Sequence, residues 1–410
     1  MNRTGKNGTE NFGLPAPTPF ERLARAHTLM VAGETAMAVA LADSMFLNVS
    51  PSDARPKVIL FLLVSIAPFA VISPVIAPFI DRIRGGQRMV VMVVGVLRAL
   101  VLVGMAFELD SWRLFPLAFS ALILGKTYAI AKSALVPTTV SHLDELVEAN
   151  SKLGRLAGIT GFIVATPALL LQKIDTRAAL IMGGVAFLGA TLNAYRLPKI
   201  AIATEKPQEL ETTELHSRTV VTAANSMRFL RGIVGFMFFH LAFWLRSEDA
   251  GTAWFGVAIA IAGLATLGAN FVGPQIRKKM REPIMLFSAL IAIVSAGIFA
   301  VWYNRIVGGI VLAAIVNASA AIGRLAFESI VQSDAPDANR GRAFARFETH
   351  NQLAWVVGGL IPIALNLSSR MGFVFVTVGA LAGALLFVRA GGVTMKSRGG
   401  RATNQEHPLH

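Results

Sequence analysis

The sequence contains no cysteine and few charged residues. Without cysteine the chain can form no disulfide, and it has no thiolate to bind a metal or act as a nucleophile. Charged residues make up 15% of the 410 residues, and hydrophobic residues make up 54%. Soluble domains carry about 25% charged residues. This balance argues against a water-soluble globular protein.

Several catalytic signatures are missing as well. The histidines show no metal-ligand spacing, and the sequence has no HExxH, no G-x-S-x-G and no G-x-x-x-x-G-K-[ST] phosphate loop. The GKT at 125–127 lacks the preceding glycine and lies within an apolar run. These absences argue against an intramembrane hydrolase, a lipid-modifying transferase and an ATP-driven pump. No metal or other cofactor is expected.

Long apolar runs recur along the chain. A helix needs about 20 apolar residues to cross the hydrocarbon core of a bilayer, and these runs lack the alternation of membrane β-strands. The sequence therefore predicts an all-α polytopic membrane protein with twelve transmembrane helices. We place the spans near residues 27–48, 57–80, 89–108, 116–140, 150–172, 177–195, 226–246, 251–276, 283–303, 306–331, 346–367 and 371–389.

Lysine and arginine are distributed unevenly between the predicted loops. With the N-terminus inside, the inner segments hold roughly three times as many of them as the outer loops. This asymmetry predicts that both termini are cytoplasmic, and it accounts for much of the net charge of +14. A nucleic-acid partner is therefore not expected.

The chain shows signs of an internal duplication around a polar segment. Three motif pairs recur at nearly the same separation, which predicts two six-helix repeats with a central site between them. The pairs are PFIDRIR with PQIRKKM, ATPALL with GLIPIAL, and ILGKTYA with AAIGRLA. The predicted parts are an N-terminal tail (1–26), a first half (27–197), a cytoplasmic linker (198–225), a second half (226–390) and a C-terminal tail (391–410).

The loop PFIDRIRGGQR, at residues 78–88, interrupts two apolar runs. It resembles the signature of the major facilitator superfamily after the second helix, which reads roughly G-x-x-x-D-R-x-G-R-R. Asp81 and Arg82 match the acidic and basic positions, Gly85 allows a tight reversal, and Arg88 matches the trailing basic residue after a small insertion. The resemblance implies a cytoplasmic latch that keeps the inner side shut while the outside is open.

Two further segments resemble the superfamily's bacterial exporters of siderophores, drugs and lysophospholipids. They are SALVPTTVSHLDELVEANSKLG at 133–154 and VQSDAPDANRGRAFARFETHNQLAWVVGG at 331–359. With the twelve spans, the resemblance covers the whole chain. It implies the major facilitator fold, a secondary transporter in a bacterial inner membrane, and a cavity lined by helices 1, 4, 7 and 10. The chain is expected to act as a monomer.

Ionisable residues inside the predicted spans are candidates for the site, because a charge at bilayer depth costs several kcal/mol unless it is paired or functional. The Gly-basic dipeptide that recurs in both halves places Lys126 and Arg324 across the cavity from each other. Such cations favour an anionic or zwitterionic ligand. The substrate-cavity candidates are Lys126, Arg324, Lys132 and His240, and the proton-coupling candidates are Glu34 and Asp43.

Depth and helical phase limit which of these groups can meet. Glu34 and Lys132 lie at similar depth, so an ion pair between them is expected. Asp43 points about 180° away from Glu34 on a straight helix, and only one of the two can face the cavity. Structural pairing is the alternative role for all of these charges, and we favour it for Arg98, Arg155 and Glu328.

The sequence therefore predicts a proton-coupled exporter of a small anionic or zwitterionic amphiphile, working by alternating access. Its partners would be that substrate, protons and the lipid bilayer. Within transport, a lysophospholipid or lipid flippase and a cationic drug efflux pump are the alternatives. Outside transport, the alternatives are a non-transporting sensor and a membrane enzyme. The excess of basic over acidic groups inside the spans favours anionic or zwitterionic cargo.

Overall fold

The structure, a computed structural model, describes residues 17–45, 86–109, 111–197, 218–245, 251–334, 340–365 and 367–392. The predicted span at 57–80 lies outside these residues, as do Asp81, Arg82 and Gly85. The backbone of Asp43 is described but its side chain is not. Within the described ranges the regular structure is helical, as the sequence predicts.

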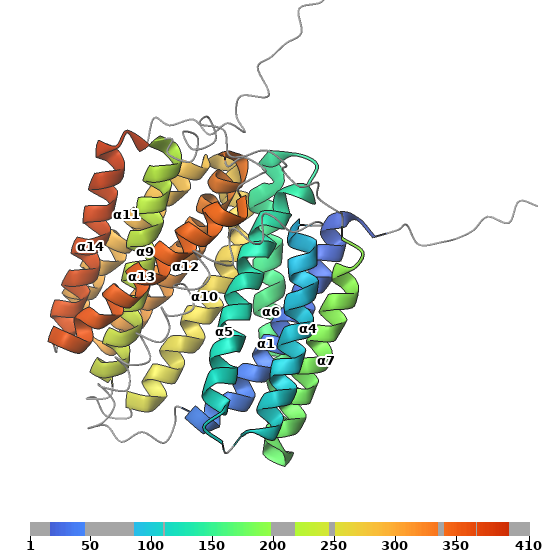
Figure 1. Ribbon diagram of the computed structural model, residues 1–410. Helices are drawn as coiled ribbons and strands as arrows, with labels where there is room; N and C mark the ends of the chain where they lie inside the picture. The colour runs from blue at the N-terminus through green and yellow to red at the C-terminus, as the bar shows by residue number, and fades with distance from the viewer. Residues whose placement is uncertain are drawn as a thin grey trace, which may run out of the picture.

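Among the described residues, five long helices belong to the N-terminal half and six to the C-terminal half (Figure 1). Each predicted span except the one at 57–80 coincides with one of them. The first five are α1 (Pro19–Met45), α4 (Gly86–Phe107), α5 (Leu114–Leu135), α6 (Leu146–Ile174) and α7 (Thr176–Ala194). The other six are α9 (Arg218–Trp244), α10 (Gly251–Lys279), α11 (Glu282–Tyr303), α12 (Ile306–Asp334), α13 (Arg340–Leu365) and α14 (Ser369–Arg389).

Two helices begin earlier than the sequence predicts. Helix α1 begins at Pro19 rather than near residue 27, and α9 begins at Arg218 rather than near residue 226. Residues 218–225, predicted as part of the linker, therefore belong to α9. Both extensions include charged residues, Glu21, Arg22 and Arg25 in α1 and Arg218 in α9. The sequence prediction therefore began each span after them, whereas the helix itself begins earlier.

Single polar residues lie at the reversals between consecutive helices. Asp175 caps α7, because its side chain accepts a hydrogen bond from the backbone N–H of Arg177 at 2.9 Å. Asn304 ends α11 in the left-handed conformation (φ 39°), and its N–H donates to the carbonyl of Ala300 at 2.8 Å. These tight turns set neighbouring helices antiparallel.

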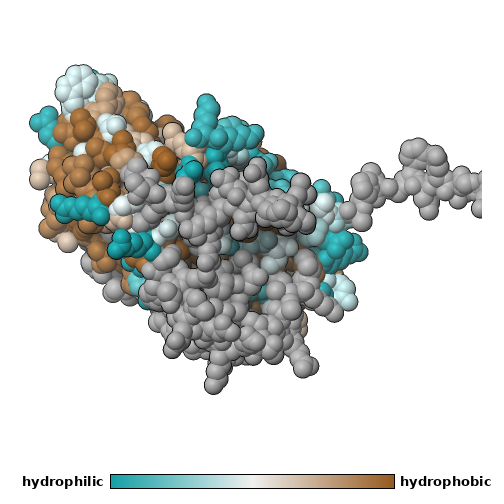
Figure 2. All heavy atoms as spheres, turned by 90° about the horizontal axis from the view of Figure 1, so that it is seen from above, coloured by the Kyte–Doolittle hydropathy of each residue, from teal (hydrophilic) through white to brown (hydrophobic). Residues whose placement is uncertain are grey.

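The helix surfaces that face outward are strongly apolar. Nine helices among the described residues are long and apolar enough to cross a membrane, and α1 and α13 are not among them. Leu100, Phe107 and Leu192 are more than half exposed. In the view from above, hydrophobic side chains gather on the flank of the C-terminal half (Figure 2). Such a surface suits contact with lipid.

The helix contacts of one half recur in the other. Helix α1 packs against α6 and α7, as α9 packs against α13 and α14. Helix α4 packs against α5 and α7, as α11 packs against α12 and α14. This correspondence confirms the predicted repeat. The halves meet where α6 packs against α10 and α12, and where α5 packs against α13.

Glycines allow α9 and α13 to cross in backbone contact. A Cβ added to Gly235 would collide with the carbonyl oxygen of Trp355, and one added to Gly358 would collide with that of Gly232. Membrane helices use small residues in this way, because close packing holds them together where the hydrophobic effect does not.

Replacing Gly235 by alanine should therefore lower the stability of the protein by about 1–3 kcal/mol, the cost of overpacking. Gly256→Ala is the matched control, because a Cβ there meets nothing within 4 Å and alanine favours helix. Thermal unfolding of the two purified variants measures the difference. Equal melting temperatures would show that the crossing tolerates the extra carbon.

Candidate functional site

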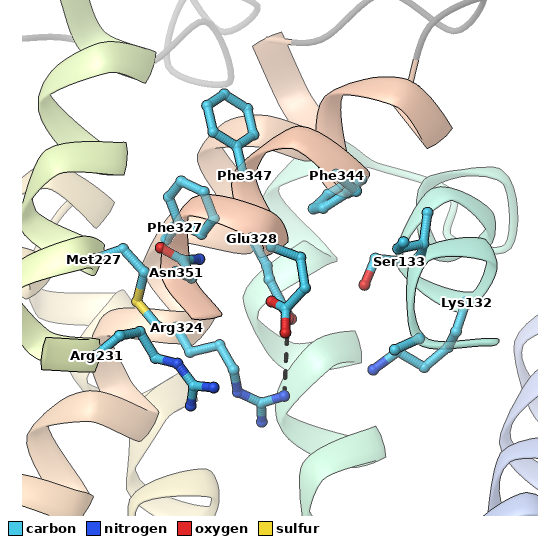
Figure 3. A pocket seen from close by; sticks show the side chains of 13 residues that line it. Lys132, Ser133, Met227, Arg231, Arg324, Phe327, Glu328, Phe344, Phe347 and Asn351 are labelled. Atoms are coloured by element: carbon cyan, nitrogen blue, oxygen red, sulfur yellow. Dashed lines mark ion pairs between the residues drawn. The ribbon is translucent and has the colours of Figure 1, made fainter. Parts of the chain in front are cut away.

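A cavity of about 240 Å³ lies between α5, α9, α12 and α13, so both halves contribute to its wall. Figure 3 shows its lining seen from close by. We call it the head cavity. Its polar lining residues include Lys132, Arg231, Arg324, Glu328, Glu348 and Asn351.

Three cations converge on the head cavity. The guanidinium groups of Arg231 and Arg324 lie near each other, and the ammonium of Lys132 points in from the opposite wall (Figure 3). Arg324 Nη1 lies 3.7 Å from Glu328 Oε1, one helical turn away. Lys132 and Arg231 have no ion-pair partner among the described residues. Two cations are thus available to an anionic ligand.

The second carboxylate of the head cavity is also engaged. Glu348 Oε1 lies 3.6 Å from Lys126 Nζ and so links α13 to α5 across the two halves. The recurring Gly-basic dipeptide predicts that Lys126 and Arg324 face each other across the cavity. The structure shows instead that Lys126 pairs with Glu348. The charge opposite Arg324 comes from Lys132.

The rest of the head cavity is apolar. Phe327, Phe344, Phe347 and Met227 line it, and the rings of Phe327 and Phe347 meet edge to face with their centroids 5.5 Å apart. A ligand here meets cations on one side and aromatic carbon on the other.

A second cavity, of about 310 Å³, adjoins the first and shares Lys132 and Arg324 with it. It adds His27 from α1 and Asn270 from α10. The His27 ring is buried, and its Nδ1 lies 2.9 Å from the hydroxyl of Tyr128. Lys132 and Arg324 therefore lie between the halves and line both cavities.

Glu34 pairs with Arg98, not with Lys132 as predicted. Glu34 Oε2 lies 3.4 Å from Arg98 Nη1; the Glu34 side chain is 56% exposed, whereas that of Arg98 is 0% exposed. The Arg98 guanidinium also stacks on the ring of Phe187, 4.2 Å from its centroid. Arg98 thus fastens α4 to α1 and α7, the structural role favoured for it from the sequence.

His240 does not reach either of these cavities. It is buried, and its ring packs against Phe236, Trp244 and Phe373. A Cβ added to Gly372 would touch its Nε2. Helix α9 does line the head cavity, but through Arg231 and Met227, which lie about two and a half and three and a half turns before His240.

Arg231, His27 and Glu348 line these cavities and were not predicted as site residues from the sequence. Arg231 lies inside the predicted span 226–246, so its depth was a usable signal. His27 lies at the predicted edge of the first span and carried no distinguishing signal.

Polar contacts join the two halves at one end of the bundle. Asn150 Nδ2 donates to Gln332 Oε1 at 2.7 Å, and Gln332 Nε2 donates to the carbonyl of Ser133 at 2.9 Å. Ser151 donates to the carbonyl of Asn270. This is the end where α1 begins (Figure 1), the predicted cytoplasmic end. These contacts close the halves on each other there.

Arg88 is the member of the predicted latch motif whose side chain is described. Its Nη1 donates to the carbonyl of Leu197 at 3.2 Å, and its guanidinium lies 5.0 Å from the centroid of the Tyr195 ring. It therefore ties the start of α4 to the end of α7, within the N-terminal half.

Two mycobacterial proteins are similar to this chain over most of its length. The chain is 27% identical over 389 residues to the uncharacterized protein ML2143 of Mycobacterium leprae, covering 84% of this chain and 66% of that protein. It is 26% identical over 387 residues to the uncharacterized protein Rv0876c of Mycobacterium tuberculosis, covering 84% and 69%. The chain thus spans about two thirds of the length of these relatives.

Solved structures share the fold at low identity. A bacterial homologue of the iron transporter ferroportin, in its outward-facing state, matches with a TM-score of 0.70 at 15% identity, over 92% of this chain and 100% of that one. The human organic anion transporter MFSD10 matches with a TM-score of 0.65 at 15% identity, over 90% of this chain and 100% of that one.

The model of the Major Facilitator Superfamily matches residues 25–359. The chain belongs to the major facilitator superfamily, a family of membrane transporters.

Proposed function

We propose that the protein is a secondary transporter that exports a small anionic or zwitterionic amphiphile across the bacterial inner membrane in exchange for protons. The observation that carries this proposal is the head cavity. Lys132 from one half and Arg231 and Arg324 from the other surround one space, so the substrate joins both halves. Alternating access requires such a site, because the halves rock around it.

The charge balance of the head cavity disfavours a cationic drug. Its two carboxylates, Glu328 and Glu348, already lie in ion pairs with Arg324 and Lys126. A cationic ligand would have to displace one of those partners and would also meet the charges of Lys132 and Arg231. An anionic group meets attraction from both of these side chains.

The proposed coupling site is the pair of Glu34 and Arg98. The Glu34 carboxylate is partly open to solvent, so a proton can reach it. Its partner Arg98 is a buried cation, which loses its counter-charge when Glu34 is protonated. Asp43 remains the second candidate. Asp81 and Arg82 are proposed to latch the cytoplasmic side, together with the contacts of Asn150 and Gln332. We further propose a monomer with both termini in the cytoplasm.

A thermal-shift screen of the detergent-purified protein tests this proposal. At 100 times its dissociation constant a ligand stabilises the folded state by about 2.7 kcal/mol. Anionic and zwitterionic amphiphiles should raise the melting temperature, whereas cationic drugs of similar hydrophobicity should not. Arg231→Ala should abolish the shift, and Arg389→Ala, at the far end of α14, should leave it unchanged.

The opposite pattern would overturn the proposal. Stabilisation by cationic drugs that persists in Arg231→Ala would show that the basic head cavity does not bind the substrate. Transport assays in proteoliposomes, with an imposed pH gradient, then measure direction and coupling for the compounds that bind.

A further inference from the structure

A third cavity, of about 270 Å³, lies between α9, α10, α12 and α13. Its wall includes Met237, Phe238, Leu241, Phe255, Ile259 and Trp355. The two polar side chains at its edge are satisfied within their own helices. Thr266 Oγ1 donates to the carbonyl of Ala262, and Asn317 Nδ2 donates to that of Ala313, each at 2.9 Å. The wall therefore presents mainly hydrocarbon and aromatic surface.

This apolar cavity adjoins the second cavity, which contains Lys132 and Arg324. Gly263 and Thr266 line both the third cavity and the second one, and the second cavity shares Lys132 and Arg324 with the head cavity. Gly263 marks an open junction, because a Cβ added there would meet nothing within 4 Å. A molecule can therefore extend from the cations past Gly263 into the apolar space.

We propose that the third cavity holds the alkyl chain of a single-chain anionic amphiphile whose charged head lies at Lys132 and Arg324. We call it the tail cavity. This inference rests on the proposed function and adds to it the place and the length of the apolar part of the substrate. With about 30 Å³ for each carbon, the volume that a water molecule takes in the liquid, the tail cavity has room for about nine carbons.

The length of the alkyl chain should then control affinity. Each methylene that leaves water for an apolar site strengthens binding about fourfold. The gain should continue along the series and level off once about nine carbons lie beyond Gly263, because further carbons find no space in the tail cavity. Binding to the cations alone would depend on the head group and not on chain length.

The test is a series of n-alkyl sulfates, from ethyl to dodecyl, titrated calorimetrically into the full chain in lipid nanodiscs. Titration into empty nanodiscs removes the contribution of partition into lipid. Gly263→Leu fills the junction, and Gly268→Leu is its matched control. Gly268 lies on the same helix, a Cβ there also meets nothing within 4 Å, and it lines none of the three cavities.

The proposal expects wild type and Gly268→Leu to show the same rise and the same plateau. Gly263→Leu should bind the short sulfates normally and lose the gain from longer chains, at least tenfold for octyl sulfate. Two results would overturn the tail cavity while leaving the proposed function intact. One is an affinity that ignores chain length although Arg231→Ala abolishes binding, and the other is an equal rise in both glycine variants. If wild type binds no member of the series, both proposals fail.

Discussion

Replacing Lys132 by methionine should weaken the binding of an anionic ligand by at least thirtyfold. Lys132 lines both the head cavity and the second cavity. It is only 9% exposed, so water screens its charge little. Removing one partner of a buried, hydrogen-bonded charge pair costs about 2–5 kcal/mol, and 2 kcal/mol corresponds to about thirtyfold in affinity. Methionine has a similar length and no charge, so the wall keeps its shape.

Lys126→Met is the matched comparison for this prediction. Both lysines lie on α5, but the ammonium of Lys126 is 3.6 Å from Glu348 on α13, whereas Lys132 has no ion-pair partner among the described residues. Lys126→Met should therefore change equilibrium binding much less than Lys132→Met. Lys132→Arg should restore most of the affinity. Calorimetric titration of the three variants with the ligand that the thermal screen finds measures the order.

An equal loss in Lys126→Met and Lys132→Met would contradict the assignment of the head cavity. It would mean that the ion pair with Glu348 opens when the ligand binds and that Lys126 reaches the ligand. That result would favour the sequence-based view of Lys126 and Arg324 as the facing cations.

The comparison of these lysines also shows what the sequence can predict. Hydropathy gives the spans, because each helix must cover about the same thickness of hydrocarbon. The recurring Gly-basic dipeptide correctly pointed to two related helices, α5 and α12, on the two sides of the central space. Arg324 and Lys132 both line the head cavity, and their role in binding a substrate stays a prediction.

The ion-pair partner of a charged residue was harder to predict from the sequence than its depth in the membrane. Depth alone put Glu34 with Lys132, but Arg98 on α4 reaches Glu34 on α1 at 3.4 Å. A depth estimate fixes one coordinate of a side chain, while its partner depends on helix rotation and on which helices are neighbours. These come from packing, such as the contact of Arg98 with Phe187, which no local pattern encodes. Arg231 was missed for a related reason, because a cation near the end of a span satisfies the rule for topology equally well.

Glu34→Gln should abolish proton-driven transport while leaving ligand binding within about threefold of wild type, as expected for a change outside the binding site. Glu34 lines neither the head cavity nor the tail cavity, so the substrate does not depend on its charge. Its partner does. The Arg98 side chain is fully buried, and its Nε and Nη2 have no hydrogen-bond partner among the described residues.

Protonation of Glu34 should act through Arg98. A neutral carboxyl leaves the guanidinium buried without a counter-charge, which costs several kcal/mol unless the surroundings rearrange. The Arg98 guanidinium stacks on Phe187 of α7, so a rearrangement there moves α4 and α7 relative to α1. On this proposal, proton binding would be converted into a change in helix packing, which is what coupling to the movement of the halves requires. The neutral amide introduced by Glu34→Gln would hold the protonated arrangement permanently.

Proteoliposome assays separate the two steps. Glu34→Gln should retain exchange of labelled for unlabelled substrate at equal concentrations, and it should fail to accumulate substrate when a pH gradient is imposed. Glu108→Gln is the matched control, because that carboxylate pairs with Arg113 at the predicted outer surface, 3.3 Å away, and should accumulate normally. Asp43→Asn is measured in parallel. Accumulation that survives Glu34→Gln and is lost in Asp43→Asn would move the proton site to Asp43 and leave Glu34 with Arg98 as a fastening between helices.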